Sequence, residues 1–214
     1  MLQTTSDQGL AFLASHEGIV PAPYRDSRGV LTWGVGHTAA AGYPYPASMS
    51  LAMPADLDAT LKSVMRTFRI DVAKYEAGVR KAFTVPLKQH EFDAAVSFHY
   101  NTGAIGSATW VKRFNAGDKA GTIRAIMNWT KNKELVPRRR AERDLFAKGA
   151  YGSGKATVWG TDGKGRVIWS PLRTVTQEQL VAMMRDAAPQ PRPTNSNPFA
   201  AFFPALLRLF LKGT

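Results

Sequence analysis

Apolar residues recur every three or four positions along much of the chain, a spacing that is typical of amphipathic helices. The longest such pattern predicts one helix over residues 54–81. A second helix is expected through Phe92 and His99, and it closes at Asn101-Thr102-Gly103, where the glycine can act as a C-cap. Shorter patterns predict three further helices, over residues 107–115, 119–129 and 137–148. The chain is therefore expected to be mainly helical.

Two stretches have the β-branched and aromatic content of strands. The first is Val30-Leu-Thr32-Trp33, which follows a turn-rich segment, and the second covers residues 156–169 around an Asp-Gly turn. Ser6 or Thr5 can cap a short helix before them, which Gly18 stops directly after Glu17. Thr176 and Gln179 have the spacing of a capping box for a last helix.

The pattern changes near residue 187. Residues 188–198 are polar and rich in proline, which predicts a stiff linker, and residues 199–214 form an apolar tail that carries Arg208 and Lys212. We therefore expect one domain over residues 1–187, with a hairpin extension at 156–170. The apolar part of the tail contains a proline and is shorter than the roughly 20 residues that cross a bilayer, so it is expected to lie on a membrane rather than to span one.

Composition narrows the class of protein. The 214 residues are 44% hydrophobic and 21% charged, which fits a globular protein. No cysteine is present, so disulfide scaffolds, thiolate zinc sites and thiol nucleophiles are excluded. The formal net charge of +12 grows toward the C-terminus and attracts nucleic acid, anionic lipid or acidic wall polymers alike.

Three familiar motifs are incomplete. Residues 149–155 have the glycine spacing of a phosphate loop, but Ala156 replaces the hydroxyl that would hold magnesium. His90-Glu91 begins a zinc-protease pattern whose second histidine is absent, because position 94 is alanine. No aromatic residues interleave with Arg138, Arg139 and Arg140, as base-stacking platforms would. We therefore expect no metal, no cofactor and no nucleic-acid partner.

Glu17, Asp26 and Thr32 remain as candidates for chemistry. Cleavage of a glycosidic bond needs a protonated carboxyl beside the leaving oxygen and a carboxylate that steers water or balances positive charge. Glu17, at a helix end, suits the first role if apolar side chains surround it, and Asp26, on a wet hairpin, suits the second. The alternative is a solvated glutamate at a helix end and an aspartate that serves only its turn.

The surrounding residues favour chemistry. Glu17-Gly18, Tyr24-Arg25-Asp26 and the run from Gly29 through Thr32-Trp33-Gly34-Val35-Gly36-His37-Thr38 resemble the phage-type lysozymes, the endolysins of glycoside hydrolase family 24. The resemblance continues through Val85-Pro-Leu87, Phe92-Asp-Ala94, Ser97–Gly103, Phe114–Gly117 and Leu135–Glu142. It implies an α+β fold in which a long helix joins a small hairpin lobe to a larger helical lobe, with the cleft between the lobes.

The resemblance also implies a function. It places Glu17 as general acid and Asp26 and Thr32 as holders of the attacking water, in an enzyme that hydrolyses the bond between N-acetylmuramic acid and N-acetylglucosamine with inversion. Asn101 is expected to line the cleft, with a helix C-cap as its other reading. Arg140 is the candidate to turn inward toward the catalytic glutamate, and a solvated basic face over Arg138, Arg139 and Arg140 is the alternative. A lytic transglycosylase and a noncatalytic wall-binding module of the same fold remain as alternatives.

Other expectations concern stability and partners. Asp71 lies on the apolar side of the long helix, where a buried acid needs a partner, and His37 is the nearest cation; this pair is expected to be structural. Peptidoglycan is the expected substrate of a monomer, and residues 199–212 are expected to contact an anionic inner or outer membrane. Because residues 1–7 lack a basic and an apolar region, no signal peptide is expected, and a phage-encoded enzyme would pass from the host cytoplasm to the periplasm or cell wall.

Overall fold

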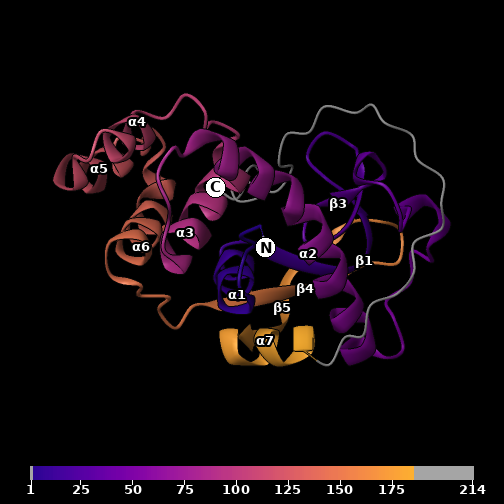
Figure 1. Cartoon of the computed structure of the whole chain (residues 1–214). Coiled ribbons are helices and arrows are strands. Elements are labelled where there is room, and N and C mark those ends of the chain that lie inside the picture. The colour runs from indigo at the N-terminus through magenta and orange to yellow at the C-terminus, as the bar shows by residue number, and fades with distance from the viewer. Residues whose placement is uncertain (1, 186–214) are drawn as a thin grey trace. The chain divides into compact units, whose positions relative to one another are not determined.

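A computed structural model describes residues 2–185 of the chain. These residues form two compact units. The helical unit comprises residues 2–13 and 72–153, and the sheet unit comprises residues 14–71 and 154–185. Two helices contribute to both units: α1 (Asp7–Ser15) and α2 (Leu57–Ala82). Figure 1 shows the course of the chain.

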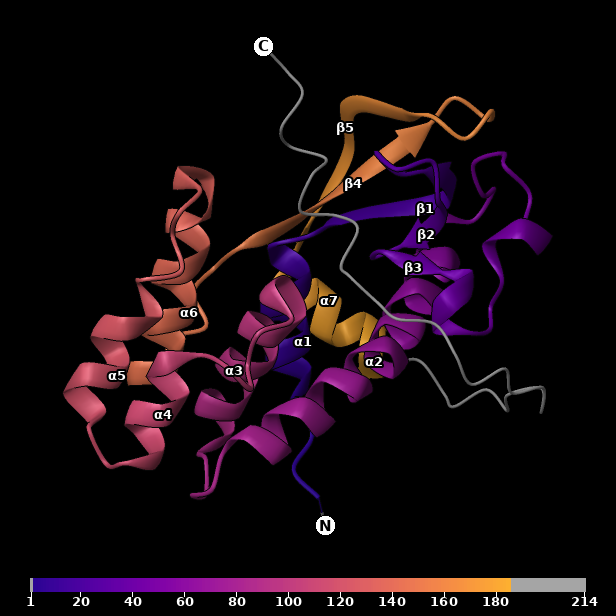
Figure 2. The ribbon, with the colours of Figure 1, turned by 90° about the horizontal axis from the view of Figure 1, so that it is seen from above.

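The sheet unit is built on five strands in the order β3-β2-β1-β4-β5 (Figure 2). Their bounds are β1 Gly18–Arg25, β2 Leu31–Gly34, β3 His37–Thr38, β4 Lys155–Thr161 and β5 Val167–Thr176. The pairs β1–β2, β2–β3 and β4–β5 are antiparallel, whereas β4 lies parallel to β1. The late hairpin is thus part of the same sheet as the early one, and β1 is its central strand.

A bulge interrupts β1. Val20 pairs with Gly34 and Tyr24 pairs with Thr32, so the three residues between Val20 and Tyr24 face a single residue of β2. Two of the three are prolines, which cannot donate a ladder hydrogen bond and are found in sheets at bulges and edges. The bulge bends the strand and shortens the distance that it spans between its two ends.

Helices cover this sheet and complete its core. The first part of α2 supplies Leu61, Val64, Met65 and Phe68, all fully buried, and α7 (Gln177–Arg185) supplies Leu180. Short 3-10 turns at Ala39–Ala41 and Pro46–Ser48 lie in the connection between β3 and α2.

The helical unit contains α3 (Gln89–Thr102), α4 (Thr109–Asn115), α5 (Lys119–Ile126) and α6 (Val136–Lys148), and α3 packs against α6 (Figure 2). A 3-10 turn at Lys133–Leu135 precedes α6. The core is a cluster of rings in edge-on and tilted contacts at centroid distances of 5.2–5.6 Å. Its members are Phe83, Phe98, Trp110, Phe114, Trp129 and Phe146.

The α+β class and most predicted elements are confirmed. The long helix covers residues 57–82, and Gly103 caps α3 with the left-handed φ of 68° that favours glycine. Ser6 caps α1 through its hydroxyl, which accepts a hydrogen bond from the Gly9 amide at 2.9 Å. The capping box at α7 is present in both directions, at 2.9 and 3.3 Å.

Strand β1 was not among the predicted elements, and several boundaries differ: α2 begins at Leu57 instead of residue 54, and α4 begins at Thr109 instead of residue 107. Helix α5 ends at Ile126 instead of reaching residue 129, and β5 continues to Thr176 because all of residues 173–176 pair with β4. No helix within residues 2–185 is both long enough and apolar enough to cross a membrane. The domain end near 187, the linker at 188–198 and the tail at 199–214 lie outside the described residues.

Candidate active site

Asp26 occupies the turn that follows β1 and organises it. The Gly29 amide donates to the Asp26 carbonyl at 2.9 Å, and Gly29 takes the positive φ of 79° that closes such a turn. One carboxylate oxygen, Oδ1, accepts hydrogen bonds from the amides of Arg28 and Val30, both at 2.9 Å. The other oxygen, Oδ2, is buried and has no hydrogen-bond partner among the described residues. A buried acceptor without a partner is rare and indicates a bound water or ligand group.

Val30 links Asp26 to Thr32. Its carbonyl accepts a hydrogen bond from the Asp26 amide at 3.0 Å and another from the Thr32 hydroxyl at 3.0 Å. Thr32 is fully buried and pairs directly with Tyr24 across the β1–β2 ladder. Side chains that are directly opposite in an antiparallel pair project on the same face, so Thr32 and Tyr24 share one face of the sheet.

Glu17 lies at the other end of β1, in the connection between α1 and the strand. Its amide donates to the Ala14 carbonyl at 3.1 Å, which continues the last turn of α1, and its side chain is buried. Glu17, Asp26 and Thr32 thus all belong to the sheet unit, as do the helix end, the bulged strand and the turn that hold them.

Tyr24 is a buried phenol whose pKa is affected by the charges of both acids, Asp26 and Glu17. Its side chain is fully buried and its hydroxyl has no hydrogen-bond partner among the described residues. Burial raises the pKa of this phenol, and the negative charges of Asp26 and then Glu17 raise it further. Both carboxylates therefore act on the same hydroxyl, which stays protonated and can donate a hydrogen bond. Tyr24 is part of the Tyr24-Arg25-Asp26 motif, but no local sequence signal indicates a role for its hydroxyl.

His37 and Asp71 are in contact, as the apolar position of Asp71 predicted. His37 Nδ1 lies 2.8 Å from Asp71 Oδ2, and His37 Nε2 lies 2.7 Å from the Pro44 carbonyl. Burial alone lowers the pKa of His37. The hydrogen bond and charge of Asp71, together with the Pro44 and Gly42 backbone, outweigh this effect, so the net pKa is raised above the ordinary value. Because both ring nitrogens face acceptors, the imidazolium is the form that this site favours.

The expectation that Arg140 turns inward is wrong. Arg140 is exposed, whereas Arg138 and Arg139 are buried. Consecutive helical residues point 100° apart, so three residues in a row cannot all face the same core. The two arginines that pair with Glu142 are the buried ones. Glu142 lies four residues after Arg138 and three after Arg139, on the same helix face, and it pairs with both. That spacing was the signal in the sequence that identifies the inward arginines.

Asn101 belongs to the same buried group in the helical unit. Its Oδ1 accepts a hydrogen bond from the Arg139 guanidinium, whose Cζ atom also lies 5.0 Å from the centre of the Phe98 ring. The Asn101 amide nitrogen is buried and has no hydrogen-bond partner among the described residues, so it is a donor available to a ligand carbonyl. The structure therefore joins Asn101 to Arg139 and not to Arg140.

No group of three or more metal-ligating side chains occurs within residues 2–185. The chemistry that these residues can perform is proton transfer and the orientation of water by carboxyl and hydroxyl groups.

Comparisons with known proteins identify the family. A family model described as phage lysozyme matches residues 14–142, a range that contains every site residue named above. The endolysin of Salmonella phage P22 is 31% identical over 153 residues, which cover 68% of this chain and 99% of the relative.

Solved structures are also similar. An endolysin from Escherichia coli O157:H7 phage FAHEc1 superposes with a TM-score of 0.59 at 32% identity, over 70% of this chain and 97% of the other. The muramidase domain of SpmX from Asticaccaulis excentricus gives a TM-score of 0.54 at 26% identity, over 67% and 97%. On the sequence match and the fold, this chain belongs to the phage lysozyme family.

Proposed function

We propose that this member of the phage lysozyme family is a muramidase that hydrolyses the β-1,4 bond between N-acetylmuramic acid and N-acetylglucosamine in bacterial peptidoglycan. The observation that carries the proposal is the unpartnered, buried Oδ2 of Asp26 beside a fully buried Thr32. A water held there would satisfy the lone pairs of Oδ2 and would be oriented by a fixed acceptor, because the Arg28 and Val30 amides hold the carboxylate in place.

Glu17 is the proposed general acid. It would protonate the leaving glycosidic oxygen while the water bound at Asp26 attacks the sugar carbon from the opposite face, which inverts the anomeric configuration. The Thr32 hydroxyl donates a hydrogen bond to the Val30 carbonyl. Its oxygen therefore has lone pairs that can accept a hydrogen bond from that water. Tyr24 is proposed as a positioning residue, since its neutral hydroxyl can donate to a group bound between the two acids.

The roles proposed for the helical unit are binding roles. The free amide donor of Asn101 fits the acetamido carbonyl that both peptidoglycan sugars carry, and Arg139 fixes the orientation of that amide. The relatives are endolysins of phages, and we propose that this chain likewise lyses a bacterial host from the periplasmic or wall side, where the net charge of +12 concentrates it on an anionic wall.

The test is digestion of purified peptidoglycan by the wild type, Glu17→Gln and Asp26→Asn, with analysis of the new chain ends. Hydrolysis produces reducing ends, and each substitution is expected to lower the rate by about 10²- to 10⁴-fold, the usual contribution of a positioned acid or base. Thr32→Val should cost less, about tenfold, because it removes one of two groups that hold the water. Anhydro sugar ends would identify a lytic transglycosylase instead, and no release by any protein would identify a noncatalytic wall-binding module.

A further inference from the structure

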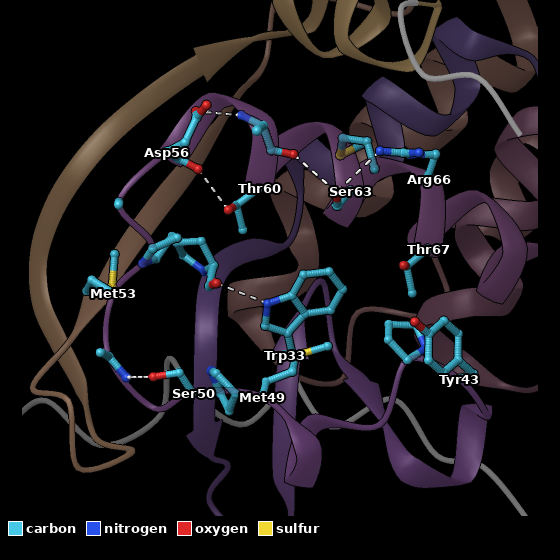
Figure 3. Close-up of a pocket in the computed structure, with 18 of the residues that line it drawn as sticks. Trp33, Tyr43, Met49, Ser50, Met53, Asp56, Thr60, Ser63, Arg66 and Thr67 are labelled. Carbon is cyan, nitrogen blue, oxygen red and sulfur yellow. Dashed lines mark hydrogen bonds between the residues drawn. The ribbon is translucent and has the colours of Figure 1, made fainter. Parts of the chain in front are cut away.

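The sheet unit contains a large apolar pocket that the proposed reaction does not use. Its volume is about 1000 Å³, and it lies among the β1 bulge, the connection 43–56 and helix α2. Figure 3 shows Trp33 in the pocket wall, held by the hydrogen bond from its indole nitrogen to the Pro21 carbonyl, with Met49, Met53 and Tyr43 around it. Glu17, Asp26 and Thr32 are not among the lining residues.

The chemistry of the wall favours an apolar occupant with large side chains. Methionines line the pocket from three parts of the chain: Met49 and Met53 from the connection, Met65 from α2 and Met184 from α7. Methionine is unbranched and adapts its shape to different partners, and it makes favourable contacts with aromatic rings. A pocket of this volume is at the upper end of the range of about 300–1000 Å³ that is usual for ligand sites, so it can hold several large side chains.

We propose that the occupant is a segment of this same chain, the apolar residues 199–212. The first argument is where the described chain leaves off. Met184 lines the pocket, Arg69 contacts its sulfur at 3.7 Å, and Arg185 is the last described residue. The connecting residues 186–198 therefore start at the pocket wall, and a proline-rich stretch of that length can reach about 40 Å. A tether of this kind gives the attached segment a millimolar effective concentration at the pocket.

The second argument is the match of sequence to pocket. The segment is rich in phenylalanine and leucine, and its two cations, Arg208 and Lys212, are four residues apart near its C-terminal end. Its large apolar residues include Phe199, Phe202, Phe203, Leu206 and Phe210.

The charge at the rim of the pocket determines how the docked segment is oriented. Asp56 lines the pocket with an exposed carboxylate, which attracts the two cations of the segment. The segment is therefore expected to insert its phenylalanines and to leave Arg208 and Lys212 on the Asp56 side. This interaction removes an apolar surface from contact with other copies of the protein.

The absence of cysteine makes a direct test possible in the full chain. Ala59 is exposed and lines the pocket, and Ala73 is an equally exposed alanine farther along α2 that does not line it. The double variants Ala59→Cys/Leu206→Cys and Ala73→Cys/Leu206→Cys are oxidised at low protein concentration, and the intramolecular disulfide is measured over time. Ala73 is about 21 Å from Ala59 along the helix, so a tethered segment that does not dock reaches both positions.

Docking predicts that the Ala59→Cys pair closes at least about tenfold faster than the Ala73→Cys pair, because the segment is held at one of two positions within reach. Adding Phe202→Asp and Phe203→Asp, which change only the segment, should lower the rate of the Ala59→Cys pair to that of its control. Equal rates for the two pairs would overturn the proposal. Disulfides that form only between molecules would also overturn it, and they would identify a second copy as the occupant. Tail-dependent uptake by anionic phospholipid vesicles, with both pairs equally slow, would overturn it too and would identify a membrane as the partner.

Discussion

Two buried acids in this protein have opposite environments. In the helical unit, both oxygens of Glu142 are satisfied: Oε1 accepts from the Ser97 hydroxyl at 2.7 Å and from Arg138 at 3.1 Å, and Oε2 accepts from Arg139. In the sheet unit, Asp26 has one oxygen held by two backbone amides and one oxygen with no described partner. A fully paired acid contributes to folding, whereas an acid that is held firmly and left half unpaired can contribute to catalysis.

The largest effect on stability is expected from Glu142→Gln. This change removes the buried carboxylate that pairs with both Arg138 and Arg139, which costs about 3–5 kcal/mol of the free energy of unfolding. Urea denaturation followed by circular dichroism measures it. As a control, Arg140→Gln on the exposed side of the same helix should change this free energy by less than about 0.5 kcal/mol. A Glu142→Gln protein as stable as the wild type would contradict the conclusion that the fully paired Glu142 contributes to folding.

The His37–Asp71 pair is expected to give a smaller and pH-dependent effect. Since the pKa of His37 is raised in the folded protein, the stabilisation is complete below the unfolded pKa of about 6.5 and is lost as the pH rises through the folded value. Asp71→Asn should therefore lower the free energy of unfolding by about 3 kcal/mol near pH 6 and by clearly less at pH 9. Thermal unfolding of both proteins across this range measures the difference. A loss that is the same at both pH values would show that charge is not the cause.

The smallest effect is expected from Tyr24→Phe. The hydroxyl has no described partner, so its removal should leave the free energy of unfolding unchanged or slightly higher, within about 1 kcal/mol. The value of kcat should fall about 2- to 10-fold, which corresponds to the loss of one hydrogen bond of about 0.5–1.5 kcal/mol. Steady-state kinetics on soluble peptidoglycan fragments measure it. An unchanged kcat would remove Tyr24 from the list of positioning residues.

Local sequence signals predicted much of this structure. The helices follow from apolar spacing and their caps, and the turn at Asp26 follows from an aspartate three residues before a glycine that has positive φ. The contact of His37 with Asp71 was predictable because an acid on an apolar helix face needs a partner.

The rest depends on contacts between distant segments. The parallel pairing of β4 with β1 joins residues 18–19 to residues 157–158, and no local pattern encodes such a pairing. The choice of Arg139 over Arg140 depends on the direction in which α6 faces its core, and the role of Tyr24 depends on the bulge that the prolines of β1 impose. The spacing of Glu142 from Arg138 and Arg139 would have predicted the choice of Arg139 over Arg140. The role proposed for Tyr24 could be inferred only from the fold.

The central claim is that Asp26 contributes to catalysis and Glu142 to folding. Its most direct test measures two quantities on one pair of variants. For Asp26→Asn and Glu142→Gln, the rate of reducing-end release per folded molecule is determined together with the free energy of unfolding. We predict that Asp26→Asn loses about 10²- to 10⁴-fold in rate. It should lose less than about 1 kcal/mol in stability, because asparagine keeps the Oδ1 acceptor for the Arg28 and Val30 amides. We predict the reverse for Glu142→Gln. A stable Asp26→Asn enzyme that releases reducing ends at the wild-type rate would contradict the account.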